Sequence, residues 1–374
     1  MSSPPLVIHV LDEQVEFASL RSLLVRDAAD SLAEYGHVEI LIGTGGGSGL
    51  PRVDRLAHPT GRAMRRSLAE VAAVAPIASV ICWSIASAIA VADSGWTDAA
   101  RVLVPERRPS GLERARLHRR REGGFECAGW SSWIDSMGAE GSWPLEPIRR
   151  MPTAAGAATR AAIEKSRLRR PLLRSAIDAS TTGVVMGLVV AGPSSVEGRS
   201  ARRDGFNIAA LAVHSHAVER VVVDPREILV EGVSTLVDET GVGWAVRPRP
   251  LARELHHWIG ALDALVVVGG PRRDPADLVL APWIAAEAGV PTFLLDDPAW
   301  TASAASGMGT LVPAEPPPAA AERLLAAIRR GELVPGAPLA SSRAATSPAF
   351  AATLAGAWRT QVATGSAKSC AAAS

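Results

Sequence analysis

The feature that most constrains this chain is its alternation of short apolar runs with helical patterns. The run Leu6–Leu11 precedes a stretch, Phe17–Ala33, whose apolar residues recur at helical spacing, and the run Val38–Ile42 follows. Continuous apolar runs of this length predict strands buried on both faces. The order strand–helix–strand predicts parallel pairing through a right-handed crossover. We therefore expect an α/β fold.

The same alternation continues through both halves of the chain. In the first half the further strand candidates are Ile77–Trp83 and Arg101–Pro105. In the second half they are Val184–Ala191, Val221–Val223, Trp244–Val246, Leu265–Val268, Thr292–Leu295 and Thr310–Val312. The helical patterns between them are Ile208–Ala217, Leu251–Leu262 and Leu278–Ala288. Strands that alternate with helices in this way predict two doubly wound Rossmann-like domains, which we place at 1–170 and 171–340. We expect a frayed tail at 365–374.

Composition excludes several classes of protein. Of 374 residues, 48% are hydrophobic and 21% charged, which excludes a disordered chain. A net charge of +1 gives no general attraction to nucleic acid, and we expect no nucleic-acid partner. Three cysteines are too few for a disulfide framework or a four-thiolate zinc site, so we expect a reducing, cytoplasmic location. The histidines are not spaced as metal ligands, and we expect no metal and no cofactor.

One uncharged stretch, Val71–Ala92, is long enough to span a bilayer. It consists mostly of Ala and Ser, with Pro76 inside, and such residues gain little in hydrocarbon. We therefore predict a helix end, a turn at Pro76, the buried strand Ile77–Trp83 and a small-residue helix.

Several motifs, in this order along the chain, resemble those of GT-B glycosyltransferases of the retaining "glycosyltransferase family 4" kind. They are the helix and strand entry Phe17–Ile40, the strand end Ile81–Ser84, the linker Arg167–Arg170, the strand Leu262–Val267, the helix-to-strand junction Glu287–Thr292 and the final helix Phe350–Val362. The resemblance implies two domains that face a cleft, with the helix at 345–364 returning to the first domain. It also implies sugar transfer from a nucleotide-sugar donor, which is a substrate here and not a cofactor.

The chain departs from the family pattern at three places. The loop after the first strand carries carboxylates where the family has glycines that approach the donor diphosphate. Ile81 stands where the family has a histidine. The two glutamates of the family would fall near Ala276 and Ile284, and neither is acidic.

Arginines in the second domain are our candidates for binding the donor diphosphate. The loop after Val184–Ala191 runs from Gly192 to Arg203 and contains Arg199 and Arg202. It follows the carboxyl end of a strand, where ligands bind in open α/β sheets, and guanidinium groups can clamp phosphate oxygens. The alternative is a solvated loop with surface arginines.

The next strand-end loop, Gly269–Asp274, supplies further donor candidates. Backbone amides near Gly270 can meet a phosphate, and Asp274 or Asp277 can bind ribose hydroxyls. The alternative for Asp277 is a helix cap. Glu287 also belongs to the donor set, with an ordinary surface residue as its alternative.

Acceptor-side candidates lie in the first half: Asp12 and Glu13 after the first strand, Trp83, and Arg107. Arg107 opens a run to Arg121 with seven arginines against one acid. This run can attract an anionic acceptor or the inner face of a membrane, or it can be an exposed charged helix. The loop Gly43–Gly49 lacks a helix directly behind it, so we expect a flexible acceptor-side loop and not a phosphate cradle.

The resemblance therefore implies a metal-independent retaining glycosyltransferase that uses a nucleotide-sugar donor and an acceptor of unknown kind. The alternative is a catalytically silent relative of the same fold that acts as a binding or scaffold module. A third option is another sugar-nucleotide enzyme of this fold, such as an epimerase.

Overall fold

The computed structural model describes residues 4–12, 19–44, 46–58, 60–96, 98–107, 109–118, 125–130, 148–151, 156–190, 196–230, 232–269, 280–295, 300, 309–312 and 317–329. Among these residues, those up to Ala158 form one compact unit, and those from Thr159 onward form a second. The division falls inside helix α6 (Ala157–Leu168), whereas the sequence pattern predicts it at residue 170. The helix expected at 345–364 and the tail at 365–374 lie outside the described residues.

The first unit is built on a parallel sheet with the order β3-β2-β1-β4-β5-β6-β7. The strands are β1 (Leu6–Leu11), β2 (Gly36–Ile42), β3 (Arg52–Leu56), β4 (Ile77–Cys82), β5 (Ala100–Leu103), β6 (Glu126–Trp130) and β7 (Ile148–Met151). From β1 the chain moves outward on one side to β3, and it then returns to β4 on the other side of β1. This reversal confirms the doubly wound fold expected for the first half.

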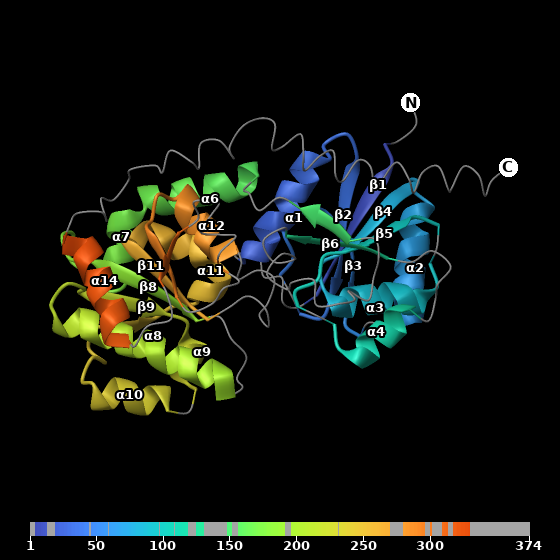
Figure 1. Ribbon diagram of the computed structural model, residues 1–374. Coiled ribbons are helices and arrows are strands. Elements are labelled where there is room, and N and C mark those ends of the chain that lie inside the picture. Colours follow the sequence, from blue (N-terminus) through green and yellow to red (C-terminus); the bar gives the residue numbers. More distant parts are fainter. Residues whose placement is uncertain are drawn as a thin grey trace. The chain divides into compact units, whose positions relative to one another are not determined.

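Helices cover both faces of this sheet (Figure 1). They are α1 (Leu20–Ser31) on one face and α2 (Gly61–Ala72), α3 (Ile85–Ser94) and α4 (Gly111–His118) on the other. Met64 and Leu68 of α2 pack with Ile8 and Val80 of the strands in one buried cluster. Ser84 and Ser87 form a capping box at the start of α3, and Gly95 ends that helix in the left-handed conformation.

Three strands of the first sheet, β3, β6 and β7, were not expected from the sequence. β3 is an edge strand whose first four residues are exposed, so it carries no apolar run. The sequences of β6 and β7, Glu-Cys-Ala-Gly-Trp and Ile-Arg-Arg-Met, also lack a continuous apolar run. A continuous apolar run identifies strands that are buried on both faces. β3, β6 and β7 lie toward the margins of the sheet and lack such a run.

The crossover from β2 to β3 is the glycine-rich loop and not a helix. Its Ser48 N–H donates to Glu39 Oε1 at 2.9 Å, and Arg26 Nε donates to the Ser48 carbonyl at 2.5 Å. A Cβ at Gly47 would lie 2.6 Å from Glu39 Oε2, so the loop can approach this buried carboxylate only with glycine there. These hydrogen bonds hold the described part of the loop Gly43–Gly49 in place, although the sequence predicts a flexible loop.

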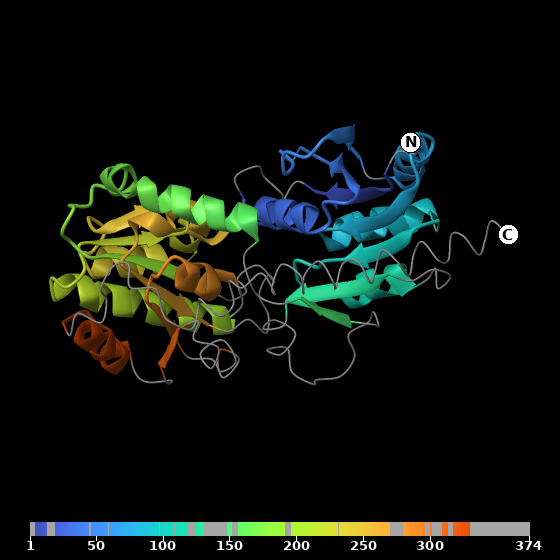
Figure 2. The ribbon, with the colours of Figure 1, turned by 90° about the horizontal axis from the view of Figure 1, so that it is seen from above.

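The second unit has a parallel sheet with the order β10-β9-β8-β11-β12-β13. The strands are β8 (Val185–Val190), β9 (Arg220–Val223), β10 (Val246–Pro248), β11 (Ala264–Val268), β12 (Thr292–Leu295) and β13 (Thr310–Val312). The helices are α6, seen from above in Figure 2, α7 (Arg170–Ser175), α8 (Val196–His214), α9 (Pro225–Ile228), α10 (Val233–Glu239), α11 (Leu251–Trp258), the 3₁₀ turn η1 (Ile259–Ala261), α12 (Leu280–Glu287) and α14 (Pro317–Arg329). All six predicted strands are present, within two residues of their expected limits.

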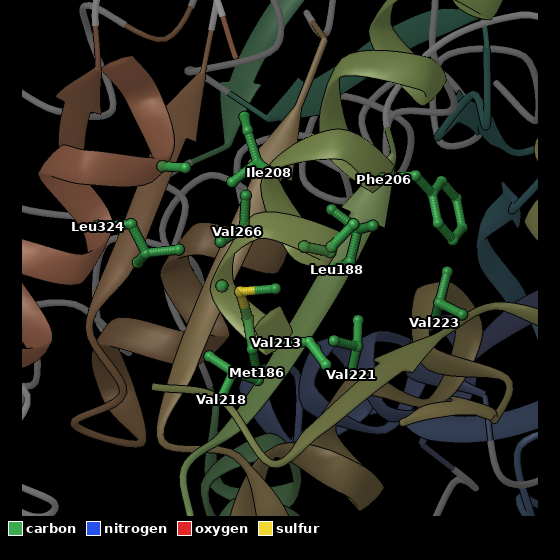
Figure 3. Packing of buried hydrophobic residues seen from close by; sticks show 14 of the residues in the cluster. Met186, Leu188, Phe206, Ile208, Val213, Val218, Val221, Val223, Val266 and Leu324 are labelled. Carbon is green, nitrogen blue, oxygen red and sulfur yellow. The ribbon is translucent and has the colours of Figure 1, made fainter. Parts of the chain in front are cut away.

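A buried apolar cluster joins α8 to one face of the second sheet (Figure 3). Phe206, Ile208 and Val213 of α8 pack against Leu188 of β8 and Val266 of β11. Burial of such side chains contributes about 1.5–3 kcal/mol each relative to exposure. The cluster holds α8 in place over the two central strands.

Buried charges hold the start of β8 and β11 to α7. Asp263 directly precedes β11, is 7% exposed, and accepts hydrogen bonds from Arg174 Nη1 at 2.9 Å and from the Val185 N–H at 2.8 Å. Arg170 forms a second ion pair with the same carboxylate. Because Arg174 is only 3% exposed, its charge depends on Asp263 for compensation.

We expect Asp263→Asn to lower the free energy of unfolding by about 3–5 kcal/mol, because the change leaves a buried guanidinium without its counter-charge. Urea denaturation followed by circular dichroism measures this loss. The matched control is Asp178→Asn, which alters an ion pair with Arg247 at a carboxylate that is 72% exposed, and it should cost less than about 1 kcal/mol. Equal losses for the two variants would contradict the role given to Asp263.

Candidate functional site

Both sets of predicted donor residues leave the second sheet where its strand order reverses. The chain moves from β8 outward to β10 and then returns to β11, which pairs directly with β8. Val190 at the end of β8 is in register with Val268 at the end of β11. In open α/β sheets, ligands bind at such a reversal, outside the carboxyl ends of the strands. The chain therefore leaves Val190 and Val268 at adjacent positions of the expected ligand edge.

Helix α8 carries the three candidate arginines in its first half. Arg202 is 5% exposed, and its Nε donates to Glu227 Oε2 of α9 at 2.6 Å. Arg203 is exposed. Arg199 lies in α8, and its side chain is outside the described part of the structure, as are Gly192, Gly270, Asp274 and Asp277.

The ion pair between Arg202 and Glu227 stabilises the packing of two helices. It ties α8 to α9, whose own start is capped by Asp224 through the Arg226 N–H. A phosphate would have to compete with Glu227 for Arg202, whereas Arg203 faces solvent. Of the two candidate arginines whose side chains are described, only Arg203 is exposed.

A tryptophan that no sequence pattern indicated contacts the start of the second donor segment, Gly269–Asp274. Trp300 is 0% exposed, and its indole N–H donates to the Gly269 carbonyl at 2.5 Å, where the chain leaves β11. Gly269 has φ +85°, a conformation that favours glycine. No spacing or motif around Trp300 indicated this role, because the contact joins residues 31 positions apart.

The structure does not bring Glu287 to the donor edge. Glu287 is the last residue of α12, a helix that returns from the carboxyl edge of the sheet toward the start of β12. The next residue, Ala288, lines a hollow together with Asp263, which precedes β11. Burial raises the pKa of Glu287, and the charge of Arg160 opposes this shift. The sequence placed Glu287 in a motif but could not show which end of the sheet that motif reaches.

In the first unit, Asp12 and Trp83 also lie at a reversal of strand order. Asp12 follows β1 and Trp83 follows β4, the two adjacent central strands, and Glu13 lies outside the described residues. Arg21, 4% exposed, donates to the carbonyl oxygens of Trp83 and Val104. Asp12 is 7% exposed.

Glu106 completes this buried charge cluster. Its Oε2 accepts the Ile85 N–H at 2.8 Å, at the start of α3. Burial raises the pKa of Glu106, the charge of Arg21 lowers it, and the charge of Asp12 raises it. Arg21 lies within the segment Phe17–Ile40 that resembles the family, and Glu106 has no motif around it. Neither was singled out from the sequence, because their contacts join distant residues.

The Trp83 side chain lies inside the first unit. It is 1% exposed, and its indole N–H donates to His9 Nδ1 at 3.1 Å. His9 Nε2 lies 3.1 Å from His37 Nδ1, and His37 Nε2 lies 2.9 Å from the Leu32 carbonyl. Because indole only donates and a carbonyl only accepts, both histidines are neutral and carry their proton on Nε2. A direct contact between Trp83 and an acceptor has no support in this geometry.

Within the described residues, the Arg107–Arg121 run is partly neutralised by ion pairs. Arg107 makes two hydrogen bonds to Glu113, at 2.9 and 2.7 Å, and this guanidinium lowers the pKa of Glu113 to about 2. Arg116 pairs with Asp93 at 2.5 Å. Helix α4 carries most of the described part of the run, and its Leu117 packs in the core of the first unit.

In the described part of the chain, no helix combines the length and the apolar character needed to cross a bilayer. The uncharged stretch Val71–Ala92 folds as expected into the end of α2, the buried strand β4 and helix α3. Cys82 of β4 is buried, and burial raises the pKa of its thiol.

Comparison with known proteins identifies the fold. No protein-family model and no curated protein matches the sequence. Among solved structures, sucrose-phosphate synthase from Thermosynechococcus elongatus matches with a TM-score of 0.59 at 15% identity, over 96% of this chain and 94% of that one. Anabaena HepE in complex with UDP and glucose matches with 0.64 at 13% identity, over 95% and 99%. WaaG, a glycosyltransferase involved in lipopolysaccharide biosynthesis, matches with 0.53 at 14% identity, over 94% and 98%. The chain has the GT-B fold.

We expect acid to destabilise the first unit through His9. Burial, with the charge of His37, lowers the pKa of His9 from 6.5 to about 3. Between these values the unfolded chain binds a proton that the folded chain does not, so stability is lost as the pH falls from 6.5 toward 3. This one group should contribute about 1.4 kcal/mol per pH unit to the free energy of unfolding.

The measurement is urea unfolding of the wild type, His9→Gln and His58→Gln over that pH range. His9→Gln should reduce the pH slope by about one proton, because glutamine does not titrate. His58 is exposed, and its variant should keep the wild-type slope. A wild-type slope in His9→Gln would show that His9 is not the titrating group.

Proposed function

We propose that this chain transfers a sugar from a nucleotide-sugar donor, held by the second unit, to an acceptor at the carboxyl edge of the first unit. The observation that carries the proposal is the pairing of β8 with β11 at the reversal of the second sheet. Each of these strands leads directly into a segment with residues suited to a diphosphate and a ribose. The structure of HepE holds UDP and glucose, which supports a nucleotide-sugar donor for a chain of the same fold.

Sugar transfer requires that the leaving diphosphate be stabilised. The amino end of α8 offers the positive end of a 19-residue helix. Exposed Arg203 lies on the same helix, seven residues after its first residue, Val196. A guanidinium can place two parallel N–H donors on phosphate oxygens and carries its charge at every physiological pH. These groups make a metal-independent reaction feasible. Retention of configuration rests on the resemblance to family 4.

On the acceptor side, the buried cluster of Asp12, Arg21 and Glu106 borders the reversal of the first sheet. Arg21 fixes the ends of β4 and β5 through their carbonyls, and Glu106 fixes the start of α3. We assign Asp12, which directly follows β1, as the group that accepts a hydrogen bond from an acceptor hydroxyl. We propose that Arg107, which forms an ion pair with Glu113, lies at the edge of the acceptor site.

A catalytically silent relative is the second candidate, and one observation favours it. Ile284, where the resemblance calls for a glutamate, is 0% exposed in α12 among other buried residues. A carboxylate at that position would be desolvated without a partner. A chain that binds the donor but transfers no sugar fits this candidate, and the assay below separates the two.

We expect UDP or GDP to bind the full chain, with Arg203→Gln weakening the affinity about tenfold through loss of a charge-assisted contact. Isothermal titration calorimetry measures the affinity, and release of nucleotide from the corresponding sugar nucleotides measures turnover. Arg323→Gln on α14, also exposed, is the matched control and should bind normally. Binding without turnover would favour the silent relative, and failure to bind any nucleotide would overturn both forms of the proposal.

We also expect Trp300→Phe to weaken nucleotide binding severalfold. Phenylalanine preserves the packing but removes the indole N–H that holds the Gly269 carbonyl, a bond of about 0.5–1.5 kcal/mol. The stability of the folded chain should fall by the same modest amount in a denaturation curve. Unchanged nucleotide affinity in Trp300→Phe would show that this bond does not position the segment after β11.

A further inference from the structure

A hollow of about 380 Å³ lies in the second unit at the end of the sheet opposite the donor edge. Asp263 and Val290, which line it, precede β11 and β12, so the hollow lies at the amino ends of these strands. Its other walls are the end of α6, the start of α7 and the turn η1. A ligand here would be separate from a nucleotide at the carboxyl ends.

The walls of this hollow are held rigidly by hydrogen bonds. Ser166 Oγ donates to the His257 carbonyl at 2.6 Å and accepts the Gly260 N–H at 2.9 Å. Arg170 donates to the carbonyls of Gly260 and Leu262, at 2.8 and 3.0 Å. A Cβ at Gly260 would lie 2.2 Å from the Ser166 carbonyl oxygen, so α6 packs directly on the η1 backbone. A site with fixed walls loses little conformational freedom when a ligand binds.

The charge around the hollow is positive. From Glu164 to Arg174 the chain carries five cations and one acid, and Asp263 in the wall is a second acid that pairs with Arg170 and Arg174. Burial lowers the pKa of His257, and the positive charges of Arg169 and Lys165 lower it further. Arg167 in the wall is 45% exposed and pairs with Glu164 only loosely, at 3.6 Å between two exposed groups. An anion can therefore replace Glu164 at Arg167 at little cost.

Apolar groups line the remainder of the hollow. Leu168 is 75% exposed, although it is a large hydrophobic residue, and Ile259, Leu262 and Val290 form a buried floor. A bare inorganic anion would leave most of this surface and volume unused, because ligand sites of this size usually enclose an apolar body with a few polar contacts.

We propose that this hollow is a binding site for a small organic anion, a carboxylate or phosphate ester with an apolar or ring-shaped body. The anionic group contacts Arg167, and the body packs on Leu168 and the apolar floor. Because the division between the two units falls within α6, the occupant contacts the same helix that connects them. The site does not depend on the nucleotide-binding role proposed for the carboxyl edge.

Three probes separate the two parts of the expected ligand: phenyl phosphate, inorganic phosphate and benzyl alcohol. By isothermal titration calorimetry on the full chain, phenyl phosphate should bind at least tenfold more tightly than inorganic phosphate or benzyl alcohol. Saturating UDP should leave this affinity unchanged. Equal binding of phenyl and inorganic phosphate, displacement by UDP, or no binding of phenyl phosphate would each overturn the site.

Two variants of exposed residues test the contacts without disturbing the core. Arg167→Gln should weaken phenyl phosphate binding about tenfold and Leu168→Ala severalfold. The controls are Arg323→Gln and Leu172→Ala, the latter altering a leucine that is 66% exposed and does not line the hollow. Loss of binding in the first pair with wild-type binding in the controls supports the site. Wild-type affinity in Arg167→Gln and Leu168→Ala would place the anion elsewhere and overturn the proposal.

Discussion

The architecture depends on one constraint: the central strands of both sheets are apolar on both faces and must be covered by helices on both sides. β8 is buried along its whole length, and so is β11. Helices can cover both faces of a parallel sheet only if the chain winds outward in one direction and then returns to the centre. The return puts β4 beside β1 and β11 beside β8. In open α/β sheets, ligands bind at such reversals, outside the carboxyl ends of the strands.

The two ends of the second sheet use buried charge differently. At the amino end, Asp263 and Arg174 neutralise each other and fasten α7 to the sheet. At the carboxyl end, Arg202 is engaged by Glu227, while Arg203, one position later on α8, is exposed. Buried ion pairs therefore hold helices at both ends of the sheet, and at the carboxyl end the neighbouring cation Arg203 is exposed. The first unit likewise concentrates buried charge at the carboxyl ends of its central strands, through Arg21 and Glu106.

Most of the fold could be predicted because the physical signal is local. A buried strand such as Thr292–Leu295 is a run of apolar residues wherever it lies in the chain, and all six strands of the second sheet were expected. β3 was missed because Arg52, Asp54 and Arg55 face solvent at an edge. The candidate site was harder to predict, since its features depend on partners far away in the sequence. The support that Trp300 gives Gly269 and the ion pair between Arg202 and Glu227 have no local signature.

By itself, the sequence determined that this chain forms two parallel α/β sheets and which segments leave their central strands. It did so because burial on both faces imposes a continuous apolar pattern that is legible one residue after another. Only the tertiary structure decided which charged groups are engaged and which are accessible. It fixed Glu287 at the amino edge, paired Arg107 with Glu113, and left Arg203 exposed. The physical reason is that a side chain's partners and its exposure are set by packing between distant segments, and the order of residues does not encode that packing locally.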